Sequence, residues 1–238
     1  LQERASPDGI AEAALMAGCQ SVAFTYNDPV IFLEYAVDVA QACHDRGIKT
    51  VAVSAGYICP APREEFYRHM DAANIDLKGF TEGFYKNLCS GHLASVLETL
   101  KYLRYETDVW FEITTLLIPG ENDSEKELHE EAAWISENLG PNVPLHFSAF
   151  HPDWKMRDVP PTFKATVKRA REIAIANGIR HVYTGNVDDE EGDATFCHSC
   201  GFKLIQRNWH AVDEYLLQPN GDCPNCETRC PGHFAPVP

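Results

Sequence analysis

The chain has 238 residues, of which 45% are hydrophobic, and its 20 basic and 35 acidic residues give a formal net charge of −15. A chain of this length can bury a substantial core, so we expect one large domain with a small appendage. The acidic balance argues against nucleic acid as a partner, because affinity for a phosphate backbone comes mainly from clustered Lys and Arg. No apolar stretch approaches the roughly 20 residues that span a bilayer, and no basic-then-apolar leader opens the sequence, so we expect a cytoplasmic protein without a membrane partner.

Short apolar runs of β type alternate with helical patterns after an opening amphipathic helix in LQERASPDGIAEAALMAG. The six runs, in chain order, are SVAFTY (21–26), IKTVAVS (48–54), NIDLKGF (74–80), VWFEITTLLI (109–118), PLHFSAF (144–150) and RHVYTG (180–185). Helical patterns follow the first five runs, at residues 30–46, 61–71, 82–105, 124–139 and 162–177. The runs are almost continuously apolar, as strands covered on both faces are, and parallel strands need such crossovers. The sequence predicts an α/β fold, an incomplete parallel (βα)6 partial TIM barrel.

Polar residues stand where these apolar runs stop. In a parallel α/β sheet the ligand site lies beyond the carboxyl ends of the strands, so these residues are the candidates for a site. Turns favour Gly, Pro, Asn and Asp in any case, and a single polar strand end is therefore best explained as a loop. The recurrence at one strand end after another favours a site. The main stretches are Tyr26-Asn27-Asp28-Pro29, Ser54-Ala55-Gly56, Asp76-Leu77-Lys78 and the segment from His146 to His151.

Several of these residues also have an explanation that involves no function, although none accounts for Tyr26 and Asn27. Asp28 before a proline is typical of a helix N-cap, because Asp caps helices and Pro suits the first turn. Asp76 and Lys78 point to the same side of a strand and could form a local ion pair of little worth at a surface. His146 and His151 could be ligands, general acid or base groups, stacking partners or hydrogen-bonded rim residues.

The C-terminal part is rich in cysteine. The acidic stretch VDDEEGD precedes it, and we place a domain boundary near residue 190, with a barrel at 1–190 and a tail at 191–238. Cys197 and Cys200 form one C-x2-C pair, and Cys223 and Cys226 form a second after 22 intervening residues. Two such pairs supply four thiolates for one tetrahedral metal ion, and the sequence between them is typical of a β-hairpin. Cys230 fits neither pair, and we assign it no role.

The spacing predicts a zinc-ribbon-like β domain. Zinc suits four soft ligands and needs no redox partner, and iron in a rubredoxin-like knuckle is the second choice. A tail of about 45 residues is a size at which a fold usually needs a metal or disulfide staple, so we expect the ion to be structural.

Taken together, these motifs resemble the radical S-adenosylmethionine (SAM) enzymes. The resemblance is to the branch that includes pyruvate formate-lyase activating enzyme, and within it to the radical SAM member of the AmmeMemoRadiSam system. It covers essentially the whole chain. The motifs that carry it, in family order, are SVAFTYNDPVIF, VAVSAGYI, NIDLKGF, TTLLIPGENDS, PLHFSAFHPDWKM, VYTGNV and the terminal FCHSCGFKLIQR with CPNC.

The resemblance implies that SAM is a cofactor and assigns it residues. Tyr26, Asn27 and Asp28 resemble the family's Gly-Gly-Glu-Pro motif, which holds the amino group of SAM. Ser54 and Gly56 resemble the Thr-Asn-Gly turn beside the methionyl group, although Ala55 replaces the Asn.

Three further residues are implied in the same way. Asp76 and Lys78 match an Asp-Leu-Lys motif near the SAM carboxylate, and His151 matches a histidine close to the adenosine end. The strand end at Ile118-Pro119-Gly120 matches the one under the adenine.

The resemblance also implies a [4Fe-4S] cluster, whose three ligands in the family form a C-x3-C-x2-C triplet. This sequence contains no such triplet, so we expect the printed chain to lack the N-terminal part of an intact enzyme and to be inactive alone. The intact form is expected to cleave SAM reductively to a 5′-deoxyadenosyl radical that abstracts hydrogen from a substrate. A protein substrate, as in glycyl-radical activases, and an electron donor are the further partners implied.

Two other hypotheses belong to different functional classes. A metal-dependent hydrolase barrel would use His146, His151, Asp76 and Glu112 at strand ends. A non-catalytic binding module would use the metal ribbon to dock a partner, with the barrel as scaffold only.

Overall fold

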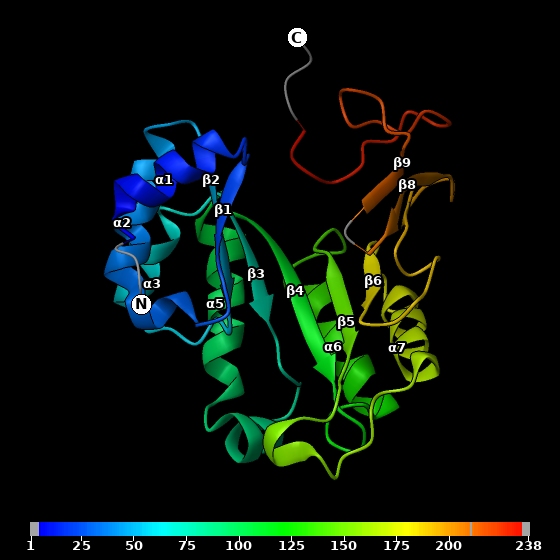
Figure 1. Ribbon diagram of the computed structural model, residues 1–238. Coiled ribbons are helices and arrows are strands. Elements are labelled where there is room, and N and C mark those ends of the chain that lie inside the picture. Colours follow the sequence, from blue (N-terminus) through cyan, green and yellow to red (C-terminus); the bar gives the residue numbers. More distant parts are fainter. Residues whose placement is uncertain (1–4, 210, 235–238) are drawn as a thin grey trace. The chain divides into compact units, whose positions relative to one another are not determined.

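The strands form two sheets in the computed structural model, which describes residues 5–209 and 211–234. The larger sheet has the order β1-β2-β3-β4-β5-β6 and the smaller the order β7-β8-β9 (Figure 1). The strands are β1 Ser21–Phe24, β2 Lys49–Ser54, β3 Ala72–Asp76, β4 Trp110–Leu117, β5 Leu145–Ala149, β6 Val182–Gly185, β7 Thr195–Phe196, β8 Lys203–Asn208 and β9 Ala211–Tyr215. Paired strands are parallel in the larger sheet and antiparallel in the smaller. The predicted parallel (βα)6 fold with a C-terminal β domain is confirmed.

Helices precede and connect the strands of the larger sheet. They are α1 Pro7–Met16, η1 Pro29–Phe32, α2 Leu33–His44, α3 Pro60–Tyr67, α4 Glu82–Phe84, η2 Tyr85–Cys89, α5 Leu93–Glu106, α6 Glu125–Asn138, η3 Trp154–Met156 and α7 Lys164–Ala176. The predicted N-cap at Asp28 is confirmed, because its carboxylate accepts a hydrogen bond from the N–H of Val30 and Pro29 begins the 3-10 turn.

One predicted helix is interrupted. The sequence predicted a continuous helical stretch at 82–105, whereas the chain forms a short α4, a π turn and then a separate α5. Ser90 between them has a left-handed backbone, with φ of 55°. A Cβ at Gly91 would lie 3.2 Å from the ring of Tyr57, so the chain passes closely under that ring. The helical pattern is correct on both sides of this crossing, but the close approach decides the local backbone.

The chain divides into two compact units, residues 1–77 with 90–112 and residues 78–89 with 113–238. In the first unit α1 packs on α2, and α2 packs on β1 and β2. The core side chains of this unit are apolar and fully or almost fully buried, and they include Val39, Phe66, Ile75, Leu100 and Leu103.

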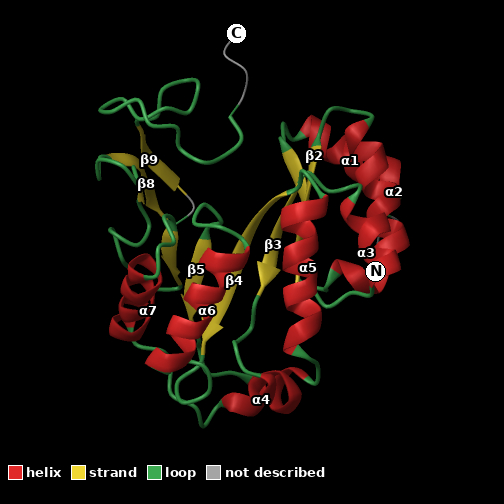
Figure 2. Cartoon of the chain, turned by 180° about the vertical axis from the view of Figure 1, so that it is seen from behind, coloured by secondary structure: helices red, strands yellow, loops and turns green. Residues whose placement is uncertain are grey.

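In the second unit α6 packs against α7, and α7 lies on β5 and β6 (Figure 2). The acidic stretch VDDEEGD belongs to this unit and is anchored by one of its own carboxylates. Asp189 is 3% exposed, accepts a hydrogen bond from the Thr184 hydroxyl (3.2 Å) and lies 3.4 Å from the ammonium of Lys168. The domain boundary near residue 190 stays a prediction.

None of the helices that the structure describes combines the length and apolar character that crossing a membrane requires.

A carboxyl group is buried between α6 and β4. Glu131 is 1% exposed, and the hydroxyl of Thr115 donates a hydrogen bond of 2.5 Å to its Oε1. Burial raises the pKa of Glu131 to about 8, because the charged form would lose its hydration. The side chain is therefore protonated at neutral pH, and it packs as a neutral group.

This raised pKa predicts a pH dependence of stability. The folded protein holds a proton on Glu131 up to about pH 8, whereas the unfolded chain releases it near the ordinary carboxyl value, so stability is lost as pH rises through that window. Replacing Glu131 with Gln is expected to remove this component, whose slope is at most about 1.4 kcal/mol per pH unit. Urea unfolding at several pH values measures it. Exposed Glu137→Gln on the same helix is the control, and an unchanged slope in Glu131→Gln would show that Glu131 is ionised in the fold.

Candidate functional site

Asp28 joins the carboxyl ends of β1 and β2 in the first unit. Its Oδ1 accepts from the N–H of Val30 (3.1 Å) and from the Ser54 hydroxyl (3.0 Å). Its Oδ2 lies 3.2 Å from the same hydroxyl and accepts from the N–H of Ala55 at 2.9 Å. The carboxylate is therefore engaged by donors from both strand ends. Asp28 and Ser54, predicted as site residues from separate motifs, lie in direct contact.

Buried groups support this junction. Ser54 is 2% exposed, and its oxygen accepts a hydrogen bond of 3.1 Å from the N–H of Gly56. Gly56 has a φ of +66°, and a Cβ there would lie 2.9 Å from Cγ2 of Ile75, so glycine is required twice over. Tyr67 of α3 is 1% exposed beneath the junction, where burial and the nearby charge of Asp28 raise the pKa of its hydroxyl. Tyr67 could not be predicted from the sequence, because a tyrosine within a helix has the pattern of an ordinary core residue.

Tyr26 and Asn27 lie at the same strand end but are exposed. Tyr26 has a left-handed backbone with φ of 69°, and its side chain is fully accessible to solvent. A non-glycine residue in this conformation is uncommon, and the anchored Asp28 beside it holds the turn in place. The junction therefore keeps a strained turn with two exposed residues at the carboxyl end of β1.

Asp76 is the last residue of β3 and is half-buried in the first unit. Lys78 belongs to the second unit, where its backbone is held on both sides. Its N–H donates to the hydroxyl of Tyr85 (3.1 Å), and its carbonyl accepts from the side-chain amide of Asn122 (2.8 Å). These two hydrogen bonds fix the backbone from which the Lys78 side chain extends.

Asn122 is the buried residue that holds the end of β4. Its amide also donates to the carbonyl of Leu116 (2.9 Å), and its oxygen accepts from the N–H of Ile118 (2.7 Å). The side chain is 1% exposed and its three bonds are all to backbone. Asn122 belongs to the polar stretch PGENDS at the end of a predicted strand. Its hydrogen bonds to the backbone could not be predicted from the sequence.

His151 follows β5 in the second unit and is exposed. The connection that it begins is tied back by Thr162, which donates to the carbonyl of Leu117 and accepts from the N–H of Phe150 (3.1 Å). His146 of β5 is stacked on Tyr183 of β6, with ring centroids 5.0 Å apart. Stacking on Tyr183 explains the presence of His146 without a ligand, whereas the side chain of His151 is exposed at the surface.

The residues of the hydrolase hypothesis do not gather into a metal site within either unit. Across residues 5–209 and 211–234, the four tail cysteines are the one group of three or more potential ligands. Glu112 accepts a hydrogen bond from the indole N–H of Trp110 at 3.2 Å. Within either unit, the described residues therefore show no such ligand set.

The four cysteines predicted as ligands come together in the tail. The Sγ atoms of Cys197, Cys200, Cys223 and Cys226 all lie within 4.8 Å of one another, with 3.6 Å between Cys197 and Cys226 and 3.7 Å between Cys200 and Cys223. A zinc ion with four sulfur ligands at its usual bond length requires sulfur–sulfur separations of about 3.8 Å. The arrangement fits a zinc ribbon, and it could hold a metal ion of that coordination.

Two matching turns present these thiols. In the first, the N–H of Cys197 donates to the carbonyl of Phe202 (2.8 Å), and the N–H of Gly201 donates to the carbonyl of Cys197 (2.9 Å). In the second, Cys223 bonds in the same way to Thr228 (2.9 Å) and Glu227 (2.9 Å). The residue after each second cysteine has a left-handed backbone, with φ of 73° at Gly201 and 60° at Glu227. The two knuckles thus have the same backbone conformation, but the left-handed position is a glycine in the first and Glu227 in the second.

The four thiols differ in pKa, because some accept hydrogen bonds and others are buried. The hydroxyl and N–H of Thr228 lower the pKa of Cys226 to about 6, and the side chain of Asn225 lowers that of Cys200. Burial raises the pKa of Cys197 to about 11. A divalent cation would favour the thiolate of every ligand, including the buried one.

The tail has a small core in which the cysteines are prominent. Its buried members are Cys197, Leu204, Leu217, Cys223 and Cys230. Cys230 therefore has a packing role, as a small buried apolar group next to the knuckles. Its pKa is raised by burial, as expected for a structural thiol.

Comparisons with known proteins show one relative in sequence and several solved structures with the same fold. No family model matches the sequence. A curated protein of Methanocaldococcus jannaschii, described as uncharacterised, is 39% identical over 202 residues, which are 85% of this chain and 60% of that protein. The chain thus spans 60% of the length of this relative.

Solved structures with the same fold include radical SAM enzymes. A domain of pyruvate formate-lyase-activating enzyme from Bacteroides vulgatus has a TM-score of 0.61 at 18% identity, and the match covers 70% of this chain and 99% of that domain. A radical SAM methyltransferase from Sphaerobacter thermophilus has a TM-score of 0.62 at 14% identity, covering 85% and 63%. SuiB of Streptococcus suis, bound to S-adenosylmethionine, has 0.62 at 14%, covering 78% and 45%. The chain has the fold of these enzymes.

Metal removal is expected to unfold the tail selectively. Three of the five buried core residues of the tail are cysteines, so without the ion the remaining apolar burial is too small to hold the fold. Chelation of the metal-loaded protein should make residues 193–238 sensitive to protease while the six-stranded sheet survives. Cys223→Ser should have the same effect without chelator, and exposed Cys59→Ser should not. Equal protease resistance of the tail with and without chelator would contradict this expectation.

The mismatch between the knuckles gives a second prediction. Glu227→Gly should stabilise the metal-bound tail, and Gly201→Ala should destabilise it, each by about 1 kcal/mol, because only glycine adopts the left-handed backbone without strain. A Cβ at Gly201 would meet no atom within 4 Å, so the cost there is conformational alone. Competition with a zinc chelator, followed by proteolysis, measures both. A shift of both variants in the same direction would refute the shared design.

Proposed function

We propose that this chain is the SAM-binding part of a radical SAM enzyme, similar to pyruvate formate-lyase activating enzyme and to the radical SAM member of the AmmeMemoRadiSam system. The observation that carries the proposal is the junction at Asp28, which holds the exposed turn of Tyr26 and Asn27 at the carboxyl end of β1. Ligands of parallel α/β folds bind at this end of the strands. The fold shared with SuiB, solved with SAM bound, supports the same assignment.

The chemistry of SAM matches the residues that the resemblance assigns to it. Its methionyl group carries an ammonium and a carboxylate. The Asp28 carboxylate is already engaged by neighbouring donors, so in this proposal the ammonium is bound by the exposed acceptors of Tyr26 and Asn27. Asp28, Ser54 and Gly56 then act as positioning residues that keep the turn in shape.

Asp76, Lys78 and His151 complete the proposed SAM residues. The ammonium of Lys78 is the natural partner for the SAM carboxylate, since a fixed backbone reduces the entropy lost when the side chain is ordered. Asp76, at the end of β3, is the acid of the same Asp-Leu-Lys motif and belongs to the proposal with it. His151 contributes a ring suited to stacking or hydrogen bonding at the adenosine end.

A reduced [4Fe-4S] cluster in such enzymes supplies the electron that cleaves SAM to methionine and a 5′-deoxyadenosyl radical. The printed sequence offers no C-x3-C-x2-C triplet to hold the cluster, and the proposal places that triplet before Leu1. The residues of this chain bind and orient SAM. An electron donor and a hydrogen-donating substrate, by analogy a glycine of a partner protein, belong to the proposal, as do a structural zinc ion in the ribbon and a cytoplasmic location.

SAM binding to the chain as printed tests the assignment of residues. Calorimetry should detect SAM binding by the wild-type protein, and Asp28→Ala should weaken it at least tenfold, because the turn loses its anchor. Asp28→Asn keeps part of the hydrogen bonding and should lie between the two. Asp213→Ala, an exposed carboxylate on β9, is the matched control and should bind like the wild type. Absence of binding by the wild type, with the fold intact, would favour the non-catalytic binding module.

The reaction is tested on the longer form. Reading the coding DNA upstream of Leu1 should reveal an in-frame C-x3-C-x2-C, and the protein that includes it should form 5′-deoxyadenosine under reducing, anaerobic conditions. A start codon without the triplet, or a reconstituted cluster that forms no 5′-deoxyadenosine, would overturn the enzymatic proposal.

A further inference from the structure

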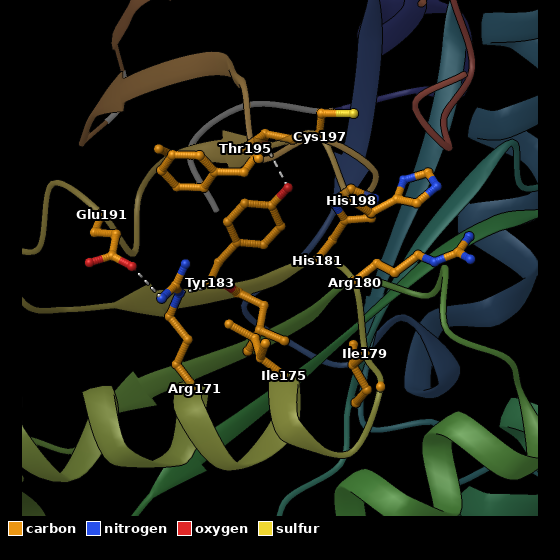
Figure 3. A pocket seen from close by; sticks show the side chains of 15 residues that line it. Arg171, Ile175, Ile179, Arg180, His181, Tyr183, Glu191, Thr195, Cys197 and His198 are labelled. Carbon is orange, nitrogen blue, oxygen red and sulfur yellow. Dashed lines mark hydrogen bonds and ion pairs between the residues drawn. The ribbon is translucent and has the colours of Figure 1, made fainter. Parts of the chain in front are cut away.

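A cavity of about 440 Å³ lies in the second unit between the end of α7, the start of β6 and the first cysteine knuckle (Figure 3). Its size falls within the range of small-molecule pockets. Residues 178–183 line it on the amino side of β6, whereas His151 follows the carboxyl end of the parallel neighbour β5. The cavity is thus at the opposite end of the strands from the residues assigned to SAM in this unit.

One wall of the cavity is cationic. Arg180 and His198 extend toward the same side in Figure 3, and the ring of His198 packs edge-on to that of His181 at 6.2 Å. The guanidinium of Arg180 donates to a neutral acceptor, Oδ1 of Asn142, at 2.8 Å. The positive charge of this wall comes from Arg180, and His198 adds an imidazole that can hydrogen-bond to an anion. Within the part of the chain that the structure describes, neither Arg180 nor His198 forms an ion pair with a carboxylate.

The other charges of the lining cancel one another. Arg171 donates to Glu191 at 3.1 Å and to the carbonyl of Val182 at 3.0 Å, which satisfies the open edge of β6. The hydroxyl of Tyr183 is hydrogen-bonded to Thr195 at 2.8 Å. The cationic wall therefore keeps its charge, although the chain as a whole has a net charge of −15 and many carboxylates that could have neutralised it.

The floor of the cavity is apolar. Ile175 is 44% exposed, and Ile179 and Phe196 also line the cavity. An unpaired cationic wall beside an apolar floor suits a ligand that has both characters. We infer that this cavity binds a small organic anion, with a phosphate or carboxylate group on Arg180 and His198 and an apolar body against Ile175, Ile179 and Phe196.

The nearest competing explanation is charge compensation at the metal site. Cys197 also lines the cavity, and four thiolates around a divalent ion leave a net negative charge that nearby cations stabilise. On that explanation Arg180 supports metal binding and the cavity has no ligand of its own. The two explanations predict different responses to the same substitution.

Titration of the metal-loaded full chain by calorimetry separates them. The probes are phenyl phosphate, benzoate, inorganic phosphate and phenol. Phenyl phosphate or benzoate should bind more tightly than inorganic phosphate, and phenol should not bind measurably. The stronger of the two aromatic anions identifies the anionic group. Metal retention is measured in parallel by competition with a chelator.

Three single substitutions locate the binding. Arg180→Gln should weaken binding of the aromatic anion and of inorganic phosphate at least fivefold and leave metal retention unchanged. Ile175→Ser should weaken the aromatic anion at least threefold and leave inorganic phosphate unchanged. Arg68→Gln removes an exposed arginine from α3 in the first unit and should bind as the wild type. All three positions are exposed or at a surface, and thermal unfolding confirms that each variant is folded.

The proposal is overturned if neither aromatic anion binds the wild-type protein, or if Arg180→Gln lowers metal retention without changing anion affinity. It is also overturned if Arg68→Gln weakens binding as much as Arg180→Gln, since the attraction would then be nonspecific. These results are independent of SAM binding, so the failure of either proposal leaves the other intact.

Discussion

The backbone polar groups at the carboxyl ends of the parallel strands set the constraint on which the rest of the structure depends. Where neighbouring strands diverge into loops, their N–H and C=O groups lose ladder partners while still close to the core, and an unpaired buried group is costly. Short polar side chains replace the lost partners. Asp28 does so between β1 and β2, Asn122 at the end of β4, Thr162 between β4 and β5, and Asn186 beside β5, where its amide donates to Ala149 at 3.1 Å. Each strand end so held becomes a fixed base for the loop that follows.

Because many polar side chains at strand ends hydrogen-bond to the backbone, a polar strand end does not by itself indicate a functional site. A hydrogen-bonding site that a side chain uses to complete the backbone is not available to a ligand. The Asp28 carboxylate is therefore structural, and in the proposed SAM site it acts only through the turn that it holds, whereas Tyr26 and Asn27 beside it are exposed. The same logic applies to the tail, where backbone bonds of the two knuckles place the thiols and leave their sulfur atoms for a metal ion.

The sequence predicted the order of the elements, the parallel sheet and the ribbon, because each rests on a pattern of regular spacing. Residues whose role depends on tertiary contacts could not be found in this way. Glu131 lies on the buried face of an amphipathic helix, and a glutamate there has no pattern that distinguishes it from an exposed one. The break at Ser90 follows from the close passage under Tyr57, which no local propensity encodes. Asn122 was marked as part of a polar loop, but its three backbone bonds require the folded strand end.

The metal knuckle and the cavity beside it are linked by the chain itself. Cys197 and Cys200 flank His198, so a metal ion that orders the knuckle also fixes the backbone from which the imidazole extends. The opposite wall needs no metal, because Ile175 and Ile179 are placed by α7 and the strand edge is satisfied by Arg171. The two isoleucines of the floor are then placed by the larger sheet and its last helix, whereas Phe196 of β7 and His198 are placed by the tail. An anion site of this kind exists only while the ribbon is folded, which makes the metal a structural condition for the ligand without being its binding partner.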